Sequence, residues 1–218
     1  VLIDPELVAF VEPEPGDPPF VNLDDLVGGD GAGSDDFLRP TSDPDSLAVL
    51  QFTSGSTSEP KGVMLTHRNA YINAYGLMAH LGVRHDDVEL WTLPMFHCNG
   101  WGGVYALTGM GGTHVVLRAV DGKAIFDLIE RERVTFACMA PAVLRTILDY
   151  PDKNEHDIRT QPRFTVAGAP PPAAFIERLE TELGWRFIEI YGLTETSPLL
   201  TVNAPDHNTE REDWSRRA

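Results

Sequence analysis

Short apolar runs alternate with longer amphipathic stretches over most of the chain beyond Ser46. An apolar run of about four to eight residues is typical of a buried strand, and apolar spacings of three and four are typical of a helix. Strands that alternate with helices indicate an α/β fold, layered, with a largely parallel sheet flanked by helices. Gly82 is placed to end the first helix and Pro141 to begin the fourth. Strands are predicted over 47–52 (buried), 113–117, 134–139, 163–167 and 187–190, and helices over 68–80, 101–110, 123–133, 141–150 and 171–183.

The first 46 residues have a different pattern. Residues 1–4 read as the end of a strand and 21–27 as a short pairing segment, but Pro, Gly and Asp dominate from 5 to 45. Such a composition offers little apolar surface for a core. Because the chain opens without methionine, we expect it to be part of a longer protein. It divides into a strand remnant with an acidic, Pro/Gly-rich connecting segment (1–46), an α/β core (47–203) and a polar tail (204–218).

Composition and charge narrow the class of function. Hydrophobic residues make up 42% of the chain, which is ordinary for a globular domain, and 33 acidic against 17 basic residues give a formal net charge of −16. An acidic surface disfavours nucleic acid and anionic lipid as partners. Two cysteines cannot build a disulfide framework, and no apolar run approaches the roughly 18 residues of a membrane span. We therefore expect a cytoplasmic protein without an integral membrane segment.

A candidate phosphate-binding loop joins the first predicted strand to a lysine, over 53–61 (TSGSTSEPK). Gly55 lets backbone N–H groups approach an anion, the hydroxyl side chains can donate to phosphate oxygens, and Lys61 supplies a positive charge. The spacing of a Walker A loop is absent. From the residues alone, an ordinary polar loop is the alternative.

A second candidate lies in 191–198 (YGLTETSP), directly after the strand that is predicted to end at Ile190. Ligands of open α/β sheets bind beyond the carboxyl ends of the strands, so this is a suitable place for a binding turn. The alternative is a Thr–Glu turn that only starts a helix, as in a capping box.

Both candidates resemble signatures of the adenylate-forming (AMP-binding) superfamily, which includes acyl-CoA synthetases, peptide-synthetase adenylation domains and firefly luciferase. Residues 63–69 (VMLTHRN) match as well, and 166–171 (VAGAPP) is similar to the family segment that lies against adenine. Residues 94–101 (PMFHCNGW) resemble the acyl-pocket segment of fatty acyl-CoA synthetases. The resemblance covers most of 47–203 and implies the central part of the large N-terminal domain. Ser58 departs from it, since the family usually has glycine there, and this puts closure of the loop over the phosphates in question.

The resemblance implies a role for each matching residue. Those at the phosphates would be Thr53, Ser54, Gly55, Ser56, Thr57 and Lys61, and those around the adenosine would be Gly168, Ala169, Pro170, Tyr191 and Gly192. Thr194 would contact the α-phosphate and Glu195 would bind Mg²⁺. His97 would lie near the reacting carboxylate, Trp101 would gate the acyl pocket and Gly192 would line it. For Trp101, plain core packing is an equal alternative. The catalytic residues would be Lys61, His97, Thr194 and Glu195.

The implied activity is that of an AMP-forming acid–thiol ligase. With ATP and Mg²⁺ it would convert a carboxylic acid, a fatty acid being the favoured class, to acyl-AMP, and coenzyme A would then take the acyl group. The ribose-binding aspartate, the hinge and the small C-terminal domain of the family do not follow within this chain, so we expect the chain alone to be a poor ligase. An adenylation domain that loads a carrier protein and a nucleotide-binding fragment without turnover are the alternatives. The identity of the acid and homodimer formation stay open.

Overall fold

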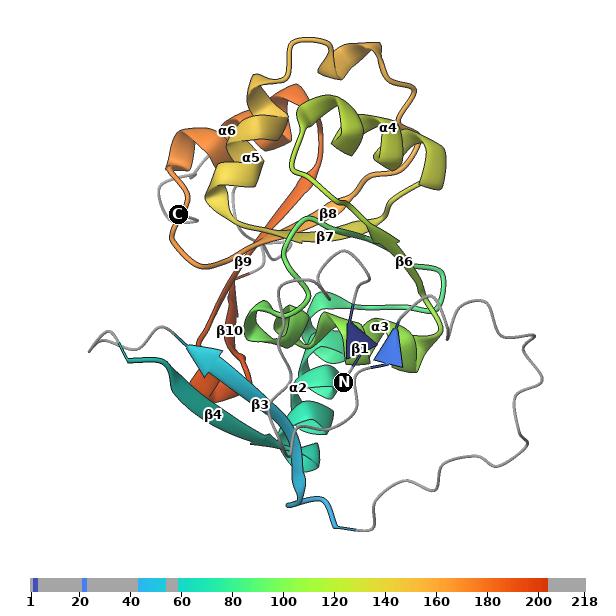
Figure 1. The fold of residues 1–218 in the computed structure, drawn as a ribbon. Helices are drawn as coiled ribbons and strands as arrows, with labels where there is room; N and C mark the ends of the chain where they lie inside the picture. The colour runs from blue at the N-terminus through green and yellow to red at the C-terminus, as the bar shows by residue number, and fades with distance from the viewer. Residues whose placement is uncertain (1, 4–20, 23–42, 54–58, 204–218) are drawn as a thin grey trace, which may run out of the picture. The chain divides into compact units, whose positions relative to one another are not determined.

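The computed structural model of the chain describes residues 2–3, 21–22, 43–53 and 59–203, without the side chains of 2–3, 21–22 and 99–101 (Figure 1). Two compact units are distinguished, Val1–Ser42 and Asp43–Ala218. In the first unit, β1 (Leu2–Ile3) and β2 (Val21–Asn22) pair in parallel. The core and the candidate site both belong to the second unit.

A six-stranded sheet runs through the second unit in the order β10-β9-β8-β7-β5-β6. Neighbouring strands are parallel, except that β10 runs antiparallel to β9. The predicted α/β class with a largely parallel sheet is therefore confirmed. The strands are β5 (Val88–Trp91), β6 (Thr113–Val116), β7 (Phe136–Met139), β8 (Arg163–Val166), β9 (Arg186–Gly192) and β10 (Leu199–Asn203).

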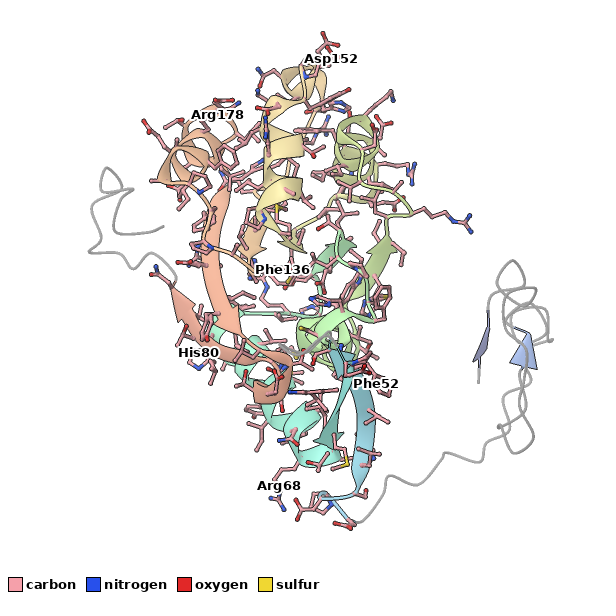
Figure 2. All side chains as sticks on the ribbon, turned by 60° about the vertical axis from the view of Figure 1, so that its left-hand side comes forward. Phe52, Arg68, His80, Phe136, Asp152 and Arg178 are labelled. Carbon is pink, nitrogen blue, oxygen red and sulfur yellow. The ribbon has the colours of Figure 1, made fainter. Side chains whose placement is uncertain are left out.

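Helices cover both faces of this sheet (Figure 1). β7 shows the result: Ala137 and Met139 lie in the core on one face, and Phe136 and Cys138 lie in the core on the other (Figure 2). A strand covered on both faces is apolar throughout, which is why this part of the chain is readable as a strand. The helices on the first face are α4 (Gly122–Glu132), α5 (Pro141–Asp149) and α6 (Ala173–Glu182), and those on the second are α2 (His67–Leu81) and α3 (Gly103–Met110).

The ends of the helices follow local sequence signals. At the start of α2, the Thr66 hydroxyl accepts from the N–H of Asn69, and the Asn69 side chain accepts from the N–H of Thr66 at 2.9 Å. Gly82 ends α2 in the left-handed conformation, with φ 63°, as predicted. Pro141 stands in the first turn of α5, also as predicted. Of the helices that the structure describes, none is long and apolar enough to cross a membrane.

The strand predicted over 47–52 forms, but outside the main sheet. β3 (Leu47–Thr53) pairs antiparallel with β4 (Lys61–Thr66) in a separate two-stranded sheet. The prediction of a buried strand is wrong, because the exposed fractions of Leu47, Leu50 and Phe52 are 53%, 51% and 66%. An apolar run has the same local pattern in a central strand and in an exposed hairpin, and pairing partners far along the chain decide between them.

Other boundaries also differ from the predictions. The helix predicted over 101–110 begins only at Gly103, because a 3₁₀ helix, η2 (His97–Gly102), precedes it and Gly102 takes a left-handed φ of 73°. The predictions omit β4, β5 and β10. Strand β5 is hard to find because Glu89, which is buried, interrupts its apolar run.

A buried ion pair ties together the amino-terminal ends of β5, β7 and β8. Arg163 donates from Nη2 to both carboxylate oxygens of Asp87, at 2.7 Å each. The hydroxyl of Thr135, which precedes β7, donates to the same carboxylate at 2.7 Å. Arg163 also donates from Nη1 to the carbonyl groups of Leu81 and Gly82, so the pair fixes the end of α2 to the sheet.

Candidate functional site

The candidate phosphate-binding loop connects the two strands of the hairpin β3–β4. Thr53 at the end of β3 and Lys61 at the start of β4 are directly paired in the ladder. Lys61 is exposed and Thr53 is half-buried, so the ends of the loop are accessible to a ligand. The residues between them that carry predicted phosphate contacts (Ser54, Gly55, Ser56 and Thr57) lie outside the described residues, and their roles stay predictions.

The carboxyl ends of four strands lie at the same edge of the sheet, because these strands, β5, β7, β8 and β9, run parallel. After β8, Gly168, Ala169 and Pro170 are all exposed, and Gly168 takes a φ of 89° with open space around it. The neighbouring strand β9 ends with Tyr191, whose exposed fraction is 55%, and Gly192. The residues expected around the adenosine therefore lie on an accessible edge of the sheet, where ligands of such folds bind.

The second signature forms a tight turn between β9 and β10. The 3₁₀ helix η4 (Thr194–Thr196) is closed by a hydrogen bond of 3.2 Å from the N–H of Ser197 to the carbonyl of Thr194. The turn does start a helix, as the alternative supposed, but only this short 3₁₀ helix with a capping box, and the chain then continues into β10. Glu195 is exposed on this turn, whereas the exposed fraction of Thr194 is 8%.

A single exposed carboxylate marks the candidate cation position at Glu195. Within the described parts of the chain, no three His, Cys, Asp or Glu side chains gather into a metal site. Mg²⁺ commonly takes one or two protein carboxylates and fills its other positions with phosphate oxygens and water. The donor at Glu195 therefore fits Mg²⁺ that arrives with a nucleotide better than it fits a resident structural ion.

The predicted acyl-pocket segment follows β5 and contacts the second signature. His97 is exposed at the start of η2. Cys98 is buried with a left-handed φ of 46°, and its Sγ lies 3.2 Å from Oγ1 of Thr194. The structure thus brings together two segments that are 96 positions apart in the sequence. The side chain of Trp101 is not among those described, so its role as a gate stays a prediction.

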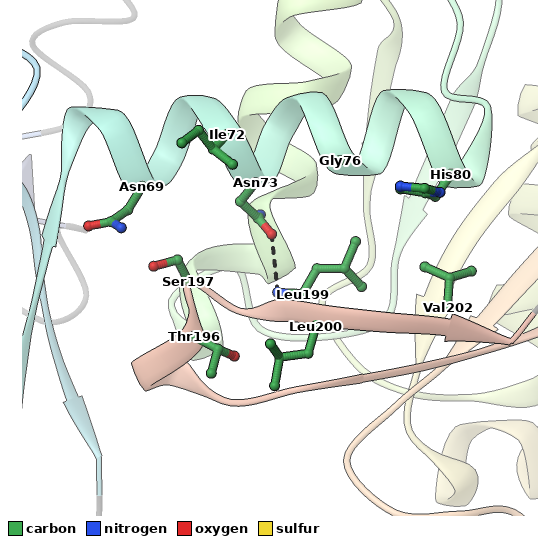
Figure 3. A pocket seen from close by; sticks show the side chains of 10 residues that line it. All are labelled: Asn69, Ile72, Asn73, Gly76, His80, Thr196, Ser197, Leu199, Leu200 and Val202. Atoms are coloured by element: carbon green, nitrogen blue, oxygen red, sulfur yellow. Dashed lines mark hydrogen bonds between the residues drawn. The ribbon is translucent and has the colours of Figure 1, made fainter.

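Two buried amides join the site, and the sequence analysis found neither. Gln51 in β3 is 7% exposed and donates from Nε2 to the carbonyl of Phe96 at 2.7 Å, while its Oε1 is buried with no partner among the described residues. Asn73 in α2 is also 7% exposed and accepts from the N–H of Leu199 at 3.1 Å (Figure 3). Neither residue belongs to a motif. The one available signal is a polar residue at an otherwise apolar position, which requires a partner when it is buried.

A groove of about 380 Å³ lies between α2 and β10 (Figure 3). Asn73 and His80 line it from α2, Thr196 and Ser197 from the turn, and Leu200 from β10. None of the predicted site residues lines this groove. It is therefore distinct from the candidate nucleotide site, although the second signature forms part of its wall.

A buried carboxyl group in β5 lies against the start of α3. Glu89 is 1% exposed, and within the described chain its oxygens have no hydrogen-bond partner other than the Cys138 thiol. A Cβ on Gly103 would lie 3.2 and 3.3 Å from these two oxygens, which shows how closely they approach the helix. Burial raises the pKa of Glu89 to about 8; a hydrogen bond with the Cys138 thiol opposes this shift, and repulsion from the carboxylate of Asp87 adds to it. Glu89 is therefore mostly uncharged at neutral pH.

Replacing Gly192 by alanine is expected to distort the turn at η4. A Cβ at this position would lie 1.9 Å from the carbonyl oxygen of Pro198, which also accepts a hydrogen bond from the N–H of Leu193. Overpacking of this kind typically costs about 1–3 kcal/mol, and chemical denaturation measures the loss. Gly76→Ala is the matched control, because its Cβ would meet nothing closer than 3.9 Å. Equal losses in both variants would contradict the steric argument.

Comparison with known proteins assigns the family. The AMP-binding enzyme family matches residues 7–217. Among curated proteins, the chain is 42% identical over 180 residues to a probable CoA ligase, CCL11, from Humulus lupulus, in an alignment that covers 83% of this chain and 30% of that protein. The chain thus spans less than a third of the length of this relative.

Solved structures agree in fold. The N-terminal domain of FACL13 from Mycobacterium tuberculosis is similar with a TM-score of 0.79 and 25% identity, over 100% of this chain and 54% of that one. The o-succinylbenzoate coenzyme A synthetase (MenE) from Bacillus subtilis, in complex with ATP and magnesium ion, is similar with a TM-score of 0.70 and 26% identity, over 86% of this chain and 38% of that one. Both the predicted family and its N-terminal-domain fold are therefore confirmed, and the chain belongs to the AMP-binding enzyme family.

Proposed function

We propose that this chain is the nucleotide- and acyl-binding part of an AMP-forming acid–CoA ligase. One observation carries the proposal: the segment with His97 contacts both the strand that leads into the phosphate-binding loop and the second nucleotide signature. Gln51 of the phosphate-loop hairpin donates to the carbonyl of Phe96, and Cys98 contacts Thr194 of η4. Membership of the family and the match to a CoA ligase support this type of reaction.

The proposed reaction has two steps. A carboxylate oxygen of the acid attacks the α-phosphorus of ATP, which forms acyl-AMP and releases pyrophosphate. The thiol of coenzyme A, on losing its proton, then attacks the acyl carbon, and AMP leaves. Such steps depend mainly on positioning and on neutralisation of phosphate charge.

The residues of this chain would serve that chemistry from the carboxyl edge of the sheet. Lys61 supplies a positive charge at the end of the phosphate loop, and the exposed ring of Tyr191 offers a face on which adenine can stack. Mg²⁺ held at Glu195 would offset charge at the α-phosphate. His97, exposed at the start of η2, would face the carboxylate of the acid.

The class of acid follows from the segment around His97. The segment around His97 favours a fatty acid, whereas one of the matched structures is named for o-succinylbenzoate. We propose a fatty acid as the substrate, with aromatic acids as the competing class. From the composition of the chain we also propose a cytoplasmic location. Calorimetric titration of the nucleotide-loaded chain with a panel of fatty and aromatic acids tests the choice, because tighter binding of the aromatic members would contradict it.

Binding of Mg-ATP is expected to weaken about ten-fold or more in Lys61→Ala and in Glu195→Gln, because a charge-assisted contact is worth about 1.5–3 kcal/mol. Calorimetric titration with ATP, with and without Mg²⁺, measures the change. Glu195→Gln should also remove most of the effect of Mg²⁺, whereas Lys61→Ala should retain it. Lys123→Ala is the control, since this exposed lysine pairs with Asp127 within α4 and should not affect binding.

Two results would count against this proposal. Saturable binding that neither substitution weakens would place the nucleotide elsewhere on the chain. No binding by the unaltered chain would show that it does not hold the nucleotide by itself.

A further inference from the structure

Residues 96–102, which we call the central segment, are fixed to the phosphate-loop hairpin by one partly buried hydrogen bond. The donor is Nε2 of Gln51, two positions before the loop begins at Thr53, and the acceptor is the carbonyl of Phe96, 2.7 Å away. A buried side-chain amide that donates to a backbone carbonyl fixes the relative position of the two segments, because breaking the bond leaves a desolvated group without a partner.

The same segment is fixed to the second signature through Cys98. Its Sγ and the Thr194 hydroxyl are 3.2 Å apart, and the exposed fractions of the two residues are 6% and 8%. Cys98 holds a φ of 46°, a conformation that residues other than glycine rarely adopt. Strained backbone of this kind persists where the surrounding contacts impose it.

A third contact joins the end of the central segment to the start of β10 through Asn73 of α2. Oδ1 of Asn73 accepts from the N–H of Leu199 (Figure 3). The same amide lies against Gly102, where a Cβ would come within 1.8 Å of Nδ2. One buried side chain, that of Asn73, therefore contacts both the end of the 3₁₀ helix η2 and the start of strand β10, and it fixes the distance between them.

We propose that Gln51, Cys98 and Asn73 are positioning residues, through which the central segment couples the acyl side of the site to the phosphate-loop hairpin and to the second signature. None of the three is expected to touch a substrate. If the proposed function holds, this coupling means that binding of the acid and binding of the nucleotide strengthen each other. Only this consequence rests on the proposed function. The mechanical coupling itself can be measured without any ligand.

Amide hydrogen exchange of the whole chain, followed by NMR without ligand, tests the contacts one at a time. In Cys98→Ala, the amide of Ser197, which closes the turn η4, should exchange about three- to ten-fold faster, as expected for the loss of one hydrogen bond. Cys98→Ser should restore the rate to within about two-fold, because a hydroxyl group can replace the contact. A mere packing role predicts that the serine variant behaves like the alanine variant, and that result would overturn the assignment.

Asn73 allows a matched pair of variants. Asn73→Asp retains the acceptor for the N–H of Leu199, and Asn73→Leu removes it. The Leu199 amide should exchange about ten-fold faster in the leucine variant alone. Equal rates in the two variants would show that the side-chain acceptor does not hold β10.

Coupling across the central segment is tested by changing its contact with the hairpin, at Gln51, and measuring the effect at the turn η4, at Ser197. Gln51→Met removes the donor at the hairpin and keeps a similar volume, and it should speed exchange of Ser197 at least about two-fold while amides of α5 keep their rates. An unchanged rate at Ser197 would overturn the coupling. Mg-ATP titration of the unaltered chain is a separate measurement: if binding fails while the exchange results hold, the chain does not hold the nucleotide by itself and the positioning role stands.

Discussion

The Asp87→Ala variant is expected to lose about 3–5 kcal/mol of unfolding free energy. Asp87 is 3% exposed, and its carboxylate accepts hydrogen bonds from Arg163, from Thr135 and from the N–H of Arg84. Alanine would leave the Arg163 guanidinium, whose side chain is 19% exposed, without its counter-ion. Most of the loss comes from this unpaired and desolvated charge rather than from the attraction itself. Urea denaturation measures it.

The neighbouring Asp86 is the matched control. It pairs with Arg84 at 2.7 Å, but the side chains of the two residues are 66% (Arg84) and 52% (Asp86) exposed. Solvent screens such a pair, so Asp86→Ala should leave the urea midpoint nearly unchanged. Similar shifts in the two variants would show that the buried pair does not contribute in the way argued above.

The stability of the protein should also fall as the pH rises, because of Glu89. Burial raises the pKa of this carboxyl from 4.5 to about 8 in the folded state. Below pH 4.5 both the folded and the unfolded state carry the neutral acid, and its contribution to stability is fully present. Between this pH and about 8 only the unfolded state ionises, so the contribution is lost. The pKa difference corresponds to a loss on the order of 5 kcal/mol.

Glu89→Gln isolates this effect from the other titrating groups. The difference in unfolding free energy between the variant and the unaltered protein should be small at pH 4.5 and should grow in favour of the variant up to about pH 8. Glu177→Gln, at an exposed position of α6, is the control. A Glu89→Gln difference that does not change with pH would mean that the carboxyl ionises equally in both states.

Much of the fold could be predicted because it depends on local patterns. The predicted α2, α4 and α5 agree with the structure to within one residue at each end, since α4 and α5 have an amphipathic period and α2 has a clear stop signal at Gly82. β7 is covered on both faces and is correspondingly apolar. The motifs likewise identified residues on the exposed edge of the sheet, such as Tyr191 and Glu195.

What could not be predicted depends on residues that are distant in the chain. The bond from Leu199 to Asn73 spans 126 positions, and neither residue lies in a pattern that points to the other. The placement of β3 in a hairpin depends on its partner strand, and a buried Glu89 contradicts the hydrophobic pattern that defines a strand. The motifs therefore named the accessible residues of the site and missed the buried amides that hold them.

The hairpin β3–β4 has a consequence for the way copies of this protein interact. Among the described strands, β3 and β4 pair only with each other, so each has an outer edge without a partner strand, and Phe52 and Met64 are 66% and 72% exposed beside these edges. Such an edge favours strand addition between molecules. The net charge of −16 opposes their approach, but salt at about 0.1 M limits this repulsion to about 10 Å. Ionic strength should therefore govern the colloidal behaviour of the protein, with dilute buffer keeping it dispersed and concentrated salt promoting its association.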